Sequence, residues 1–153
     1  MSVADEEIDD IPDGWVFAAL GEIATINPRH PRDADGSLQV TFVPMPAISE
    51  SQPSFKFTET RPLSDVRKGY THFGEGDVLF AKITPCMENG KGAIARGLVN
   101  GMGCGTTELH IVRSSAAVLP EYVYHYLHQE QVRSNAAARF SGSAGQLRVP
   151  LEF

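Results

Sequence analysis

The chain has 153 residues and a formal net charge of −6, with 42% hydrophobic and 21% charged residues. These values are ordinary for one globular domain with a buried core, and they exclude a chain that crosses a membrane as a helix, because no apolar run reaches roughly 20 residues. Two cysteines, and a start (MSVADEEIDD) without the basic and apolar parts of a signal peptide, indicate the reducing cytoplasm.

The acidic charge is concentrated at the beginning of the chain. Residues 1–13 hold six acidic residues and neither Lys nor Arg, so the acids and the 13 bases are equal in number over residues 14–153. We predict an acidic, flexible tail over 1–13 and a neutral domain over 14–153. Such a domain can still present a basic face, although it lacks the overall positive field of a nonspecific DNA-binding protein.

In the first half of the chain, predicted loops are longer than predicted strands. The apolar stretch Trp15–Leu20 is expected to start the fold. Asn27–Ser37 is rich in Pro, Asp and Gly and predicts an exposed loop. Val40–Val43 predicts a short strand, and Glu50–Pro62 predicts a second loop in which basic and aromatic residues alternate.

The second half contains the clearest elements. The apolar run Asp77–Ile83 predicts a buried strand, and Ala93–Ala95 and Thr107–Val112 predict two more. A single helix is predicted from Glu121 to about Ala138, although its apolar spacing fades half-way and alanine propensity then supports it. The fold class is therefore α+β: one mixed, strand-dominated domain with one main C-terminal helix.

The segment GDVLFAKITPCMENGKG (76–92) is the first candidate for a binding site. A strand followed by a polar turn can hold Lys82, Thr84 and Lys91 on one edge, where ammonium and hydroxyl groups suit phosphate oxygens. A plain hairpin with two solvated lysines is the alternative, and the residue types alone favour it. The segment lacks the spacing of a nucleotide-binding phosphate loop, which excludes nucleotide hydrolysis.

The segment FSGSAGQLRVP (140–150) is the second candidate. Its small residues let the backbone approach a partner closely, and the hydroxyls of Ser141 and Ser143 suit phosphate contacts. Gln146 is a candidate reader of base edges and Arg148 a candidate cation. The alternative is a flexible connection between a helix and a strand.

No catalytic residue, cofactor or metal ligand set is predicted. His125 and His128 have a spacing that can bind metal, but no third ligand follows, so a surface pair is favoured. Cys86 and His110 could form a nucleophile–base pair in a small hydrolase, although no orienting residue accompanies them and packing is the simpler role. Glu108 fits a structural ion pair better than it fits contact with a cytosine amino group.

Four segments in order resemble the target-recognition domain of specificity subunits of type I restriction–modification systems. The resemblance covers most of residues 11–153 and rests on Ile11–Ile23, Gly76–Ile94, Gly105–Val112 and Ser141–Pro150. The second segment is long and distinctive, and the others add weight because their order is the expected one.

The resemblance implies sequence-specific binding of double-stranded DNA by a non-catalytic component. In this family two such domains each read half of a split site, long helical spacers dock the methyltransferase subunits, and a restriction subunit joins them. S-adenosylmethionine and ATP are bound by those partners. The implied duplex contacts are the polar residues of the second and last segments: Lys82, Thr84, Lys91, Ser141, Ser143, Gln146 and Arg148. Base reading is expected in the loops over 27–39 and 50–62.

The chain departs from the family pattern because it stops at Phe153, without a helical spacer or a second recognition domain. We therefore expect a truncated or half-length subunit that binds DNA weakly on its own. The alternative is an orphan recognition-like domain that contacts proteins and not DNA, which the acidic tail fits better. A homodimer is an arrangement that the sequence leaves open.

Overall fold

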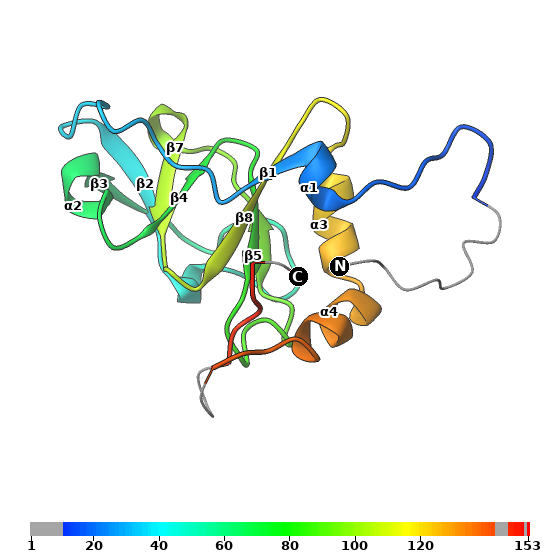
Figure 1. The fold of residues 1–153 in the computed structure, drawn as a ribbon. Coiled ribbons are helices and arrows are strands. Elements are labelled where there is room, and N and C mark those ends of the chain that lie inside the picture. Colours follow the sequence, from blue (N-terminus) through cyan, green and yellow to red (C-terminus); the bar gives the residue numbers. More distant parts are fainter. Residues whose placement is uncertain (1–10, 143–146, 152) are drawn as a thin grey trace.

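Two four-stranded β-sheets form the body of the computed structural model, which describes residues 11–142, 147–151 and 153 (Figure 1). The first sheet has the order β1–β8–β5–β6, with bounds Ala24–Ile26, Leu109–Ser114, Val78–Ala81 and Gly92–Ile94. The second has the order β3–β2–β7–β4, with bounds Glu59–Pro62, Gln39–Val43, Met102–Gly105 and Thr71–Gly74. This mixed, strand-dominated architecture confirms the predicted fold class.

The first sheet is buried on both faces, which explains the unbroken apolar run of β5. Val78 and Phe80 of this strand belong to a cluster that includes residues of the C-terminal helices, whereas Leu79 and Ala81 belong to the core shared with the second sheet. Successive side chains of a strand point to opposite faces, so a strand between two layers must be apolar at every position. β5 pairs antiparallel with both β6 and β8.

The second sheet carries its own small core on its other face. Val40 and Phe42 of β2 pack there with Leu63 and Val66 of the short helix α2 (Leu63–Val66). β2 pairs parallel with β7 and antiparallel with β3. The two 3-10 turns, η1 and η2, span Met45–Ala47 and Val99–Gly101.

β7 is a strand built around glycine, and the sequence did not predict it. A Cβ atom at Gly103 would lie 2.1 Å from the Phe73 ring, and one at Gly105 would lie 2.6 Å from the Val43 carbonyl oxygen. A side chain at Gly103 would therefore displace the Phe73 ring, and one at Gly105 would displace the backbone of β2. Because glycine has low strand propensity, the pattern hides a strand that the packing requires.

The single predicted C-terminal helix is two helices, α3 (Pro120–Leu127) and α4 (Glu130–Ala137). The break falls at His128 and Gln129, where Gln129 has an extended backbone with φ −62° and ψ 137°. The ring nitrogens of His128 lie 2.7 Å from the Tyr124 carbonyl oxygen and 2.8 Å from that of Gly90. The chain therefore leaves the helical path where His128 ties it to the turn after β5. No described helix has the length and apolarity to cross a membrane.

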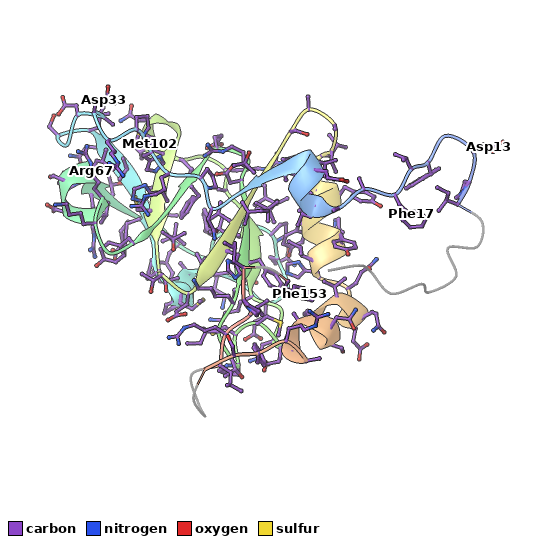
Figure 2. All side chains as sticks on the ribbon, viewed as in Figure 1. Asp13, Phe17, Asp33, Arg67, Met102 and Phe153 are labelled. Atoms are coloured by element: carbon purple, nitrogen blue, oxygen red, sulfur yellow. The ribbon has the colours of Figure 1, made fainter. Side chains whose placement is uncertain are left out.

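The packed part of the chain begins later than the apolar stretch Trp15–Leu20 suggested. Leu20 opens the short helix α1 (Leu20–Ile23) and packs against the C-terminal helices, but Trp15, Val16 and Phe17 are 60%, 84% and 60% exposed. Figure 2 shows Phe17 on an arm that stands away from the sheets. The predicted acidic tail falls mostly on residues 1–10, which lie outside the described residues.

Candidate nucleic-acid interface

The structure brings the second and last predicted segments together at one end of β5. Thr84 donates its N–H to the Leu147 carbonyl at 2.9 Å, and Val149 donates to the Lys82 carbonyl at 2.7 Å. Ser141 and Arg148 exchange two backbone hydrogen bonds, each 3.0 Å long. Lys82, Thr84, Ser141 and Arg148 therefore share one surface, which we name the strand-end surface; Ser143 and Gln146 lie outside the described residues.

Acidic groups occupy much of the strand-end surface. The Arg148 guanidinium donates two hydrogen bonds to the Glu108 carboxylate, at 2.7 and 2.8 Å. The Arg148 guanidinium holds the pKa of Glu108 below its usual range, and the charge of Lys82 contributes to the same shift. Thr84 donates its hydroxyl to Glu88 at 2.8 Å. The structural role predicted for Glu108 is thus confirmed, and the local positive charge is partly neutralised.

Lys91 is separate from the strand-end surface. Its Nζ lies 3.4 Å from the carbonyl oxygen of Met45, and its side chain is half-buried beside η1. Its backbone closes the turn after β5 by donating to the Cys86 carbonyl at 3.0 Å. The structure therefore places Lys91 where it helps to join the two sheets.

A second basic surface lies on the loop between β1 and β2, at the other end of the molecule in Figure 1. We name residues 28–36 the arginine loop, because Arg29 and Arg32 are exposed on it. Neither guanidinium has an ion-pair partner within the part of the chain that the structure describes. Figure 2 shows Asp33, which is also exposed, at the outer end of this loop, with Arg67 close by.

Two side-chain anchors fix the backbone of the arginine loop. Asn27, at φ 51°, donates its N–H to the Ile111 carbonyl at 2.8 Å, and its Oδ1 accepts the Ile111 N–H at 2.7 Å. The Arg67 guanidinium donates to the carbonyl of Arg32 at 3.4 Å and to that of Ala34. The loop is therefore bound to β8 at its start and to the end of α2 further along.

A stacked pair of histidines fixes the middle of the same loop. The rings of His30 and His72 lie 4.8 Å apart at 18°, and His30 donates its backbone N–H to His72 Nδ1 at 3.1 Å. His72 Nε2 lies 2.7 Å from the Arg67 carbonyl oxygen, and His30 Nε2 lies 2.7 Å from that of Gly103. Since Nδ1 of His72 accepts and Nε2 faces a carbonyl, this ring is the neutral Nε2–H tautomer.

The electrostatic surroundings keep the two histidines neutral. Burial lowers the pKa of both imidazoles, and the Arg29 guanidinium lowers both further. His72 is only 3% exposed, and Arg29 lies 3.4 Å from its Nε2. A proton added to His72 Nδ1 would remove the acceptor of the His30 N–H, so the arrangement depends on the neutral form.

The second predicted loop, 50–62, is more closely packed than the arginine loop. Phe55 packs on the core against Phe73, and the last four residues of the segment form β3. Arg61 is paired with Glu59 at 2.7 Å and lies over the Phe42 ring. Lys56 is the exposed cation of this segment without an ion pair among the residues described.

The other predicted alternatives find little support in the geometry. The described residues contain no group of three or more potential metal ligands, and His128 is engaged with two carbonyls. His110 is also engaged, with Nε2 2.8 Å from the Val149 carbonyl oxygen and Nδ1 3.3 Å from Asn27 Nδ2. Cys86, the predicted nucleophile of the pair, is partly buried and packs against the hydrophobic core, in keeping with the simpler packing role.

Comparison with known proteins gives a long match. The chain is 43% identical over 150 residues to the type I restriction enzyme EcoEI specificity subunit of Escherichia coli, and 41% identical to the EcoAI specificity subunit of the same organism. Each match covers 97% of this chain. The chain is a relative of type I restriction–modification specificity subunits. It spans about a quarter of the length of these two relatives, and no family model matches it.

Two solved structures from type I restriction–modification systems share the fold of this chain. It superposes on the HsdS subunit from Thermoanaerobacter tengcongensis with a TM-score of 0.71 and 19% identity, over 95% of this chain and 37% of that one. A chain from a study of complex assembly in a type I restriction–modification system gives 0.67 and 20%, over 90% and 35%. The relationship is to the specificity component of these enzymes, which is not a catalytic subunit.

Sequence reasoning selected the arginine loop by its composition but missed the residues that organise it. His72 and Arg67 lie in a stretch that carries no pattern of its own, and they meet the loop only through the folding of β4 and α2. The available signal was the density of Pro, Asp and Gly in a segment that precedes a predicted strand.

Proposed function

We propose that this chain binds double-stranded DNA sequence-specifically, as one half-site reader of a type I specificity component. The observation that carries the proposal is the 43% identity to a specificity subunit over 97% of the chain. The two exposed arginines of the arginine loop supply hydrogen-bond donors of the type that duplex recognition needs. The isolated chain is expected to bind weakly and with strong salt dependence, because one half-site offers few contacts.

The strand-end surface is proposed to contact the phosphate backbone. Lys82 and the hydroxyls of Thr84 and Ser141 suit phosphate oxygens, and Arg148 presents a guanidinium braced by Glu108. Lys91, Ser143 and Gln146 complete the duplex contacts proposed from the sequence. Such contacts position a protein on DNA without reading its sequence.

Association with methyltransferase and restriction subunits in the cytoplasm is part of the same proposal. Those subunits would supply methylation and cleavage, with their own cofactors, and this chain would supply none of the chemistry. One solved relative comes from a study of type I complex assembly. The alternative is a protein-interaction domain without DNA binding, which the exposed side chains of Trp15, Val16 and Phe17 favour. A homodimer would be one form of that alternative.

Selection from a randomised duplex library at low salt, followed by sequencing of the bound fraction, tests the proposal. Enrichment of one short contiguous motif relative to a protein-free control is the expected result. No enrichment, together with capture of a methyltransferase subunit, would favour the protein-interaction alternative. Tight binding that salt does not weaken would contradict the expected dominance of phosphate contacts.

A further inference from the structure

We propose that the arginine loop reads base edges in the duplex through Arg29, Arg32 and Asp33, and that the His30–His72 stack is its positioning device. The inference rests on the proposed function and deepens it, because it names the specificity-determining residues. It also assigns a separate role to each surface: the arginine loop reads the base sequence, and the strand-end surface contacts phosphates.

The polar groups of the arginine loop have the chemistry that base reading requires. A guanidinium can donate two hydrogen bonds to O6 and N7 of guanine, and a carboxylate can accept from the amino group of cytosine. Arg29, Arg32 and Asp33 are exposed and lack ion-pair partners in the described part of the chain. On the strand-end surface, in contrast, Arg148 is already paired with Glu108.

The loop is balanced in charge, which favours reading over simple attraction to phosphate. Arg29 and Arg32 are followed by Asp33 and Asp35 within the loop itself. Asp35 is exposed but already engaged, because its Oδ1 accepts hydrogen bonds from Ser37 N and Oγ at 2.9 and 2.8 Å. Three side chains of two signs therefore remain for base contacts.

The backbone that carries these side chains is fixed before any DNA is bound. Pro28 and Pro31 restrict it, and the Ala34 N–H donates to the Pro31 carbonyl at 3.2 Å. Arg67 holds Arg32 by its carbonyl, so the Arg32 side chain is left outside. A preorganised loop loses little entropy on binding, and its side chains keep a defined register.

The histidine stack places Arg29 and makes the loop sensitive to acid. His30 follows Arg29 directly and is bound to His72, whose Nδ1 accepts its N–H. The charged groups that face the two rings are Arg29, Arg67, Arg113 and Asp77, and the cations oppose protonation. Forced protonation would detach residue 30 and displace Arg29 without altering the strand-end surface.

The direct test measures discrimination between the selected motif and a panel of duplexes with one altered base pair. The variants are Arg29→Ala, Arg32→Ala and Asp33→Asn, compared with Lys56→Ala, which removes an exposed cation from the other loop in which base reading was expected. Each arginine variant is expected to lose about 5- to 150-fold of discrimination at one base-pair position, because that is the range for one bidentate contact, and Asp33→Asn is expected to lose less. Lys56→Ala is expected to keep every preference.

A pH series on the unaltered chain tests the positioning role of the stack. Lowering the pH from about 7.5 until NMR shows that the His30 and His72 rings are protonated should reduce the ratio of motif to mismatch affinity, although added positive charge alone would strengthen binding to any duplex. Circular dichroism at each pH establishes that the chain is folded. An unchanged or rising ratio would refute the positioning role.

The outcomes separate the inference from the proposed function. If the unaltered chain enriches a motif and the Arg29 and Arg32 variants keep full discrimination at every position, the arginine loop is not the reader and the proposed function stands. If the unaltered chain enriches no motif, the proposed function fails, and the inference fails with it.

Discussion

The strand-end surface and the arginine loop use their charges in opposite ways. At the strand end, Arg148 is paired with Glu108 and Thr84 is bonded to Glu88. In the arginine loop the guanidinium groups of Arg29 and Arg32 are exposed, and the neutral His30–His72 stack fixes the backbone of the loop. The first surface therefore pairs its charges within the fold, and the second leaves its guanidinium groups exposed.

The difference indicates what the segments that resemble the family contribute. Asp77, within the most distinctive segment, is 1% exposed and accepts two hydrogen bonds of 2.9 Å from Arg113 and one of 2.7 Å from the Gly74 N–H. This carboxylate joins β5 to β8 and β4. Asp77, in the segment that resembles the family, thus supports the frame, and the arginine loop, which matches no fixed motif, carries the proposed readers.

The largest expected effect is on the support of the arginine loop. His72→Ala should lower the free energy of unfolding by about 3 kcal/mol, because it opens a cavity and leaves the His30 N–H and the Arg67 carbonyl without their partner. Urea titration measures the change. His125→Ala, at an exposed histidine, is the control and should lower the free energy of unfolding by less than about 0.5 kcal/mol. Equal losses for the two variants would show that the histidine stack does not stabilise the arginine loop.

A smaller stability loss is expected at the strand end. Glu108→Ala should cost about 1–2 kcal/mol, because the carboxylate is partly buried and receives both Arg148 hydrogen bonds, although the exposure of Arg148 limits the penalty. Glu88→Ala, which removes an exposed partner of Thr84, is the matched control and should cost under about 0.5 kcal/mol. The same urea titration compares them, and a neutral Glu108→Ala would remove the structural role of the pair.

The arginine loop and the strand-end surface should lose their contributions to stability in different pH ranges. The pKa of His30 and of His72 is lowered in the folded chain, so the unfolded chain binds more protons, and stability is lost as pH falls below about 6.5. The pKa of Glu108 is also lowered, so its contribution is lost only below about 4.5. Urea midpoints between about pH 7.5 and 5 should fall for the unaltered chain and fall less for His72→Ala. A flat profile would contradict the neutral stack.

The smallest expected effect concerns affinity at the strand end. Lys82→Ala should weaken binding to all duplexes by a similar factor and reduce the slope of log affinity against log salt by about 1. Fluorescence anisotropy with matched and mismatched duplexes measures both quantities. A change of base preference in this variant would contradict the assignment of base reading to the arginine loop, because Lys82 lies on the strand-end surface.

Sequence patterns predicted the buried strands well and the second sheet poorly. The apolar runs of β2, β5, β6 and β8 are visible because burial on one or both faces constrains their composition. β7 is hidden by its glycines, and β3 lies inside a segment that has the composition of a loop. The end of α3 at His128 depends on a contact with Gly90, which only the folded chain brings near.

The candidate sites divide in the same manner. The sequence grouped Lys82, Thr84 and Lys91, but the structure separates Lys91 from the other two. The acids on the strand-end surface, Glu108 and Glu88, come from elsewhere in the chain or across the turn. The arginine loop was predicted as a loop from local composition, whereas its rigidity depends on His72 and Arg67, far along the chain. Local patterns indicate which residues are exposed, and tertiary contacts decide which of them are held in place.

The most direct test of the division between the two surfaces is parallel selection from one randomised duplex library. The unaltered chain is compared with an Arg29→Ala/Arg32→Ala variant of the arginine loop and with a Lys82→Ala variant of the strand-end surface, each first shown to be folded. We predict that the lysine variant recovers the same motif in lower yield, and that the arginine variant recovers a degenerate motif or none. Recovery of the original motif by the arginine variant, with a changed motif from the lysine variant, would contradict the account.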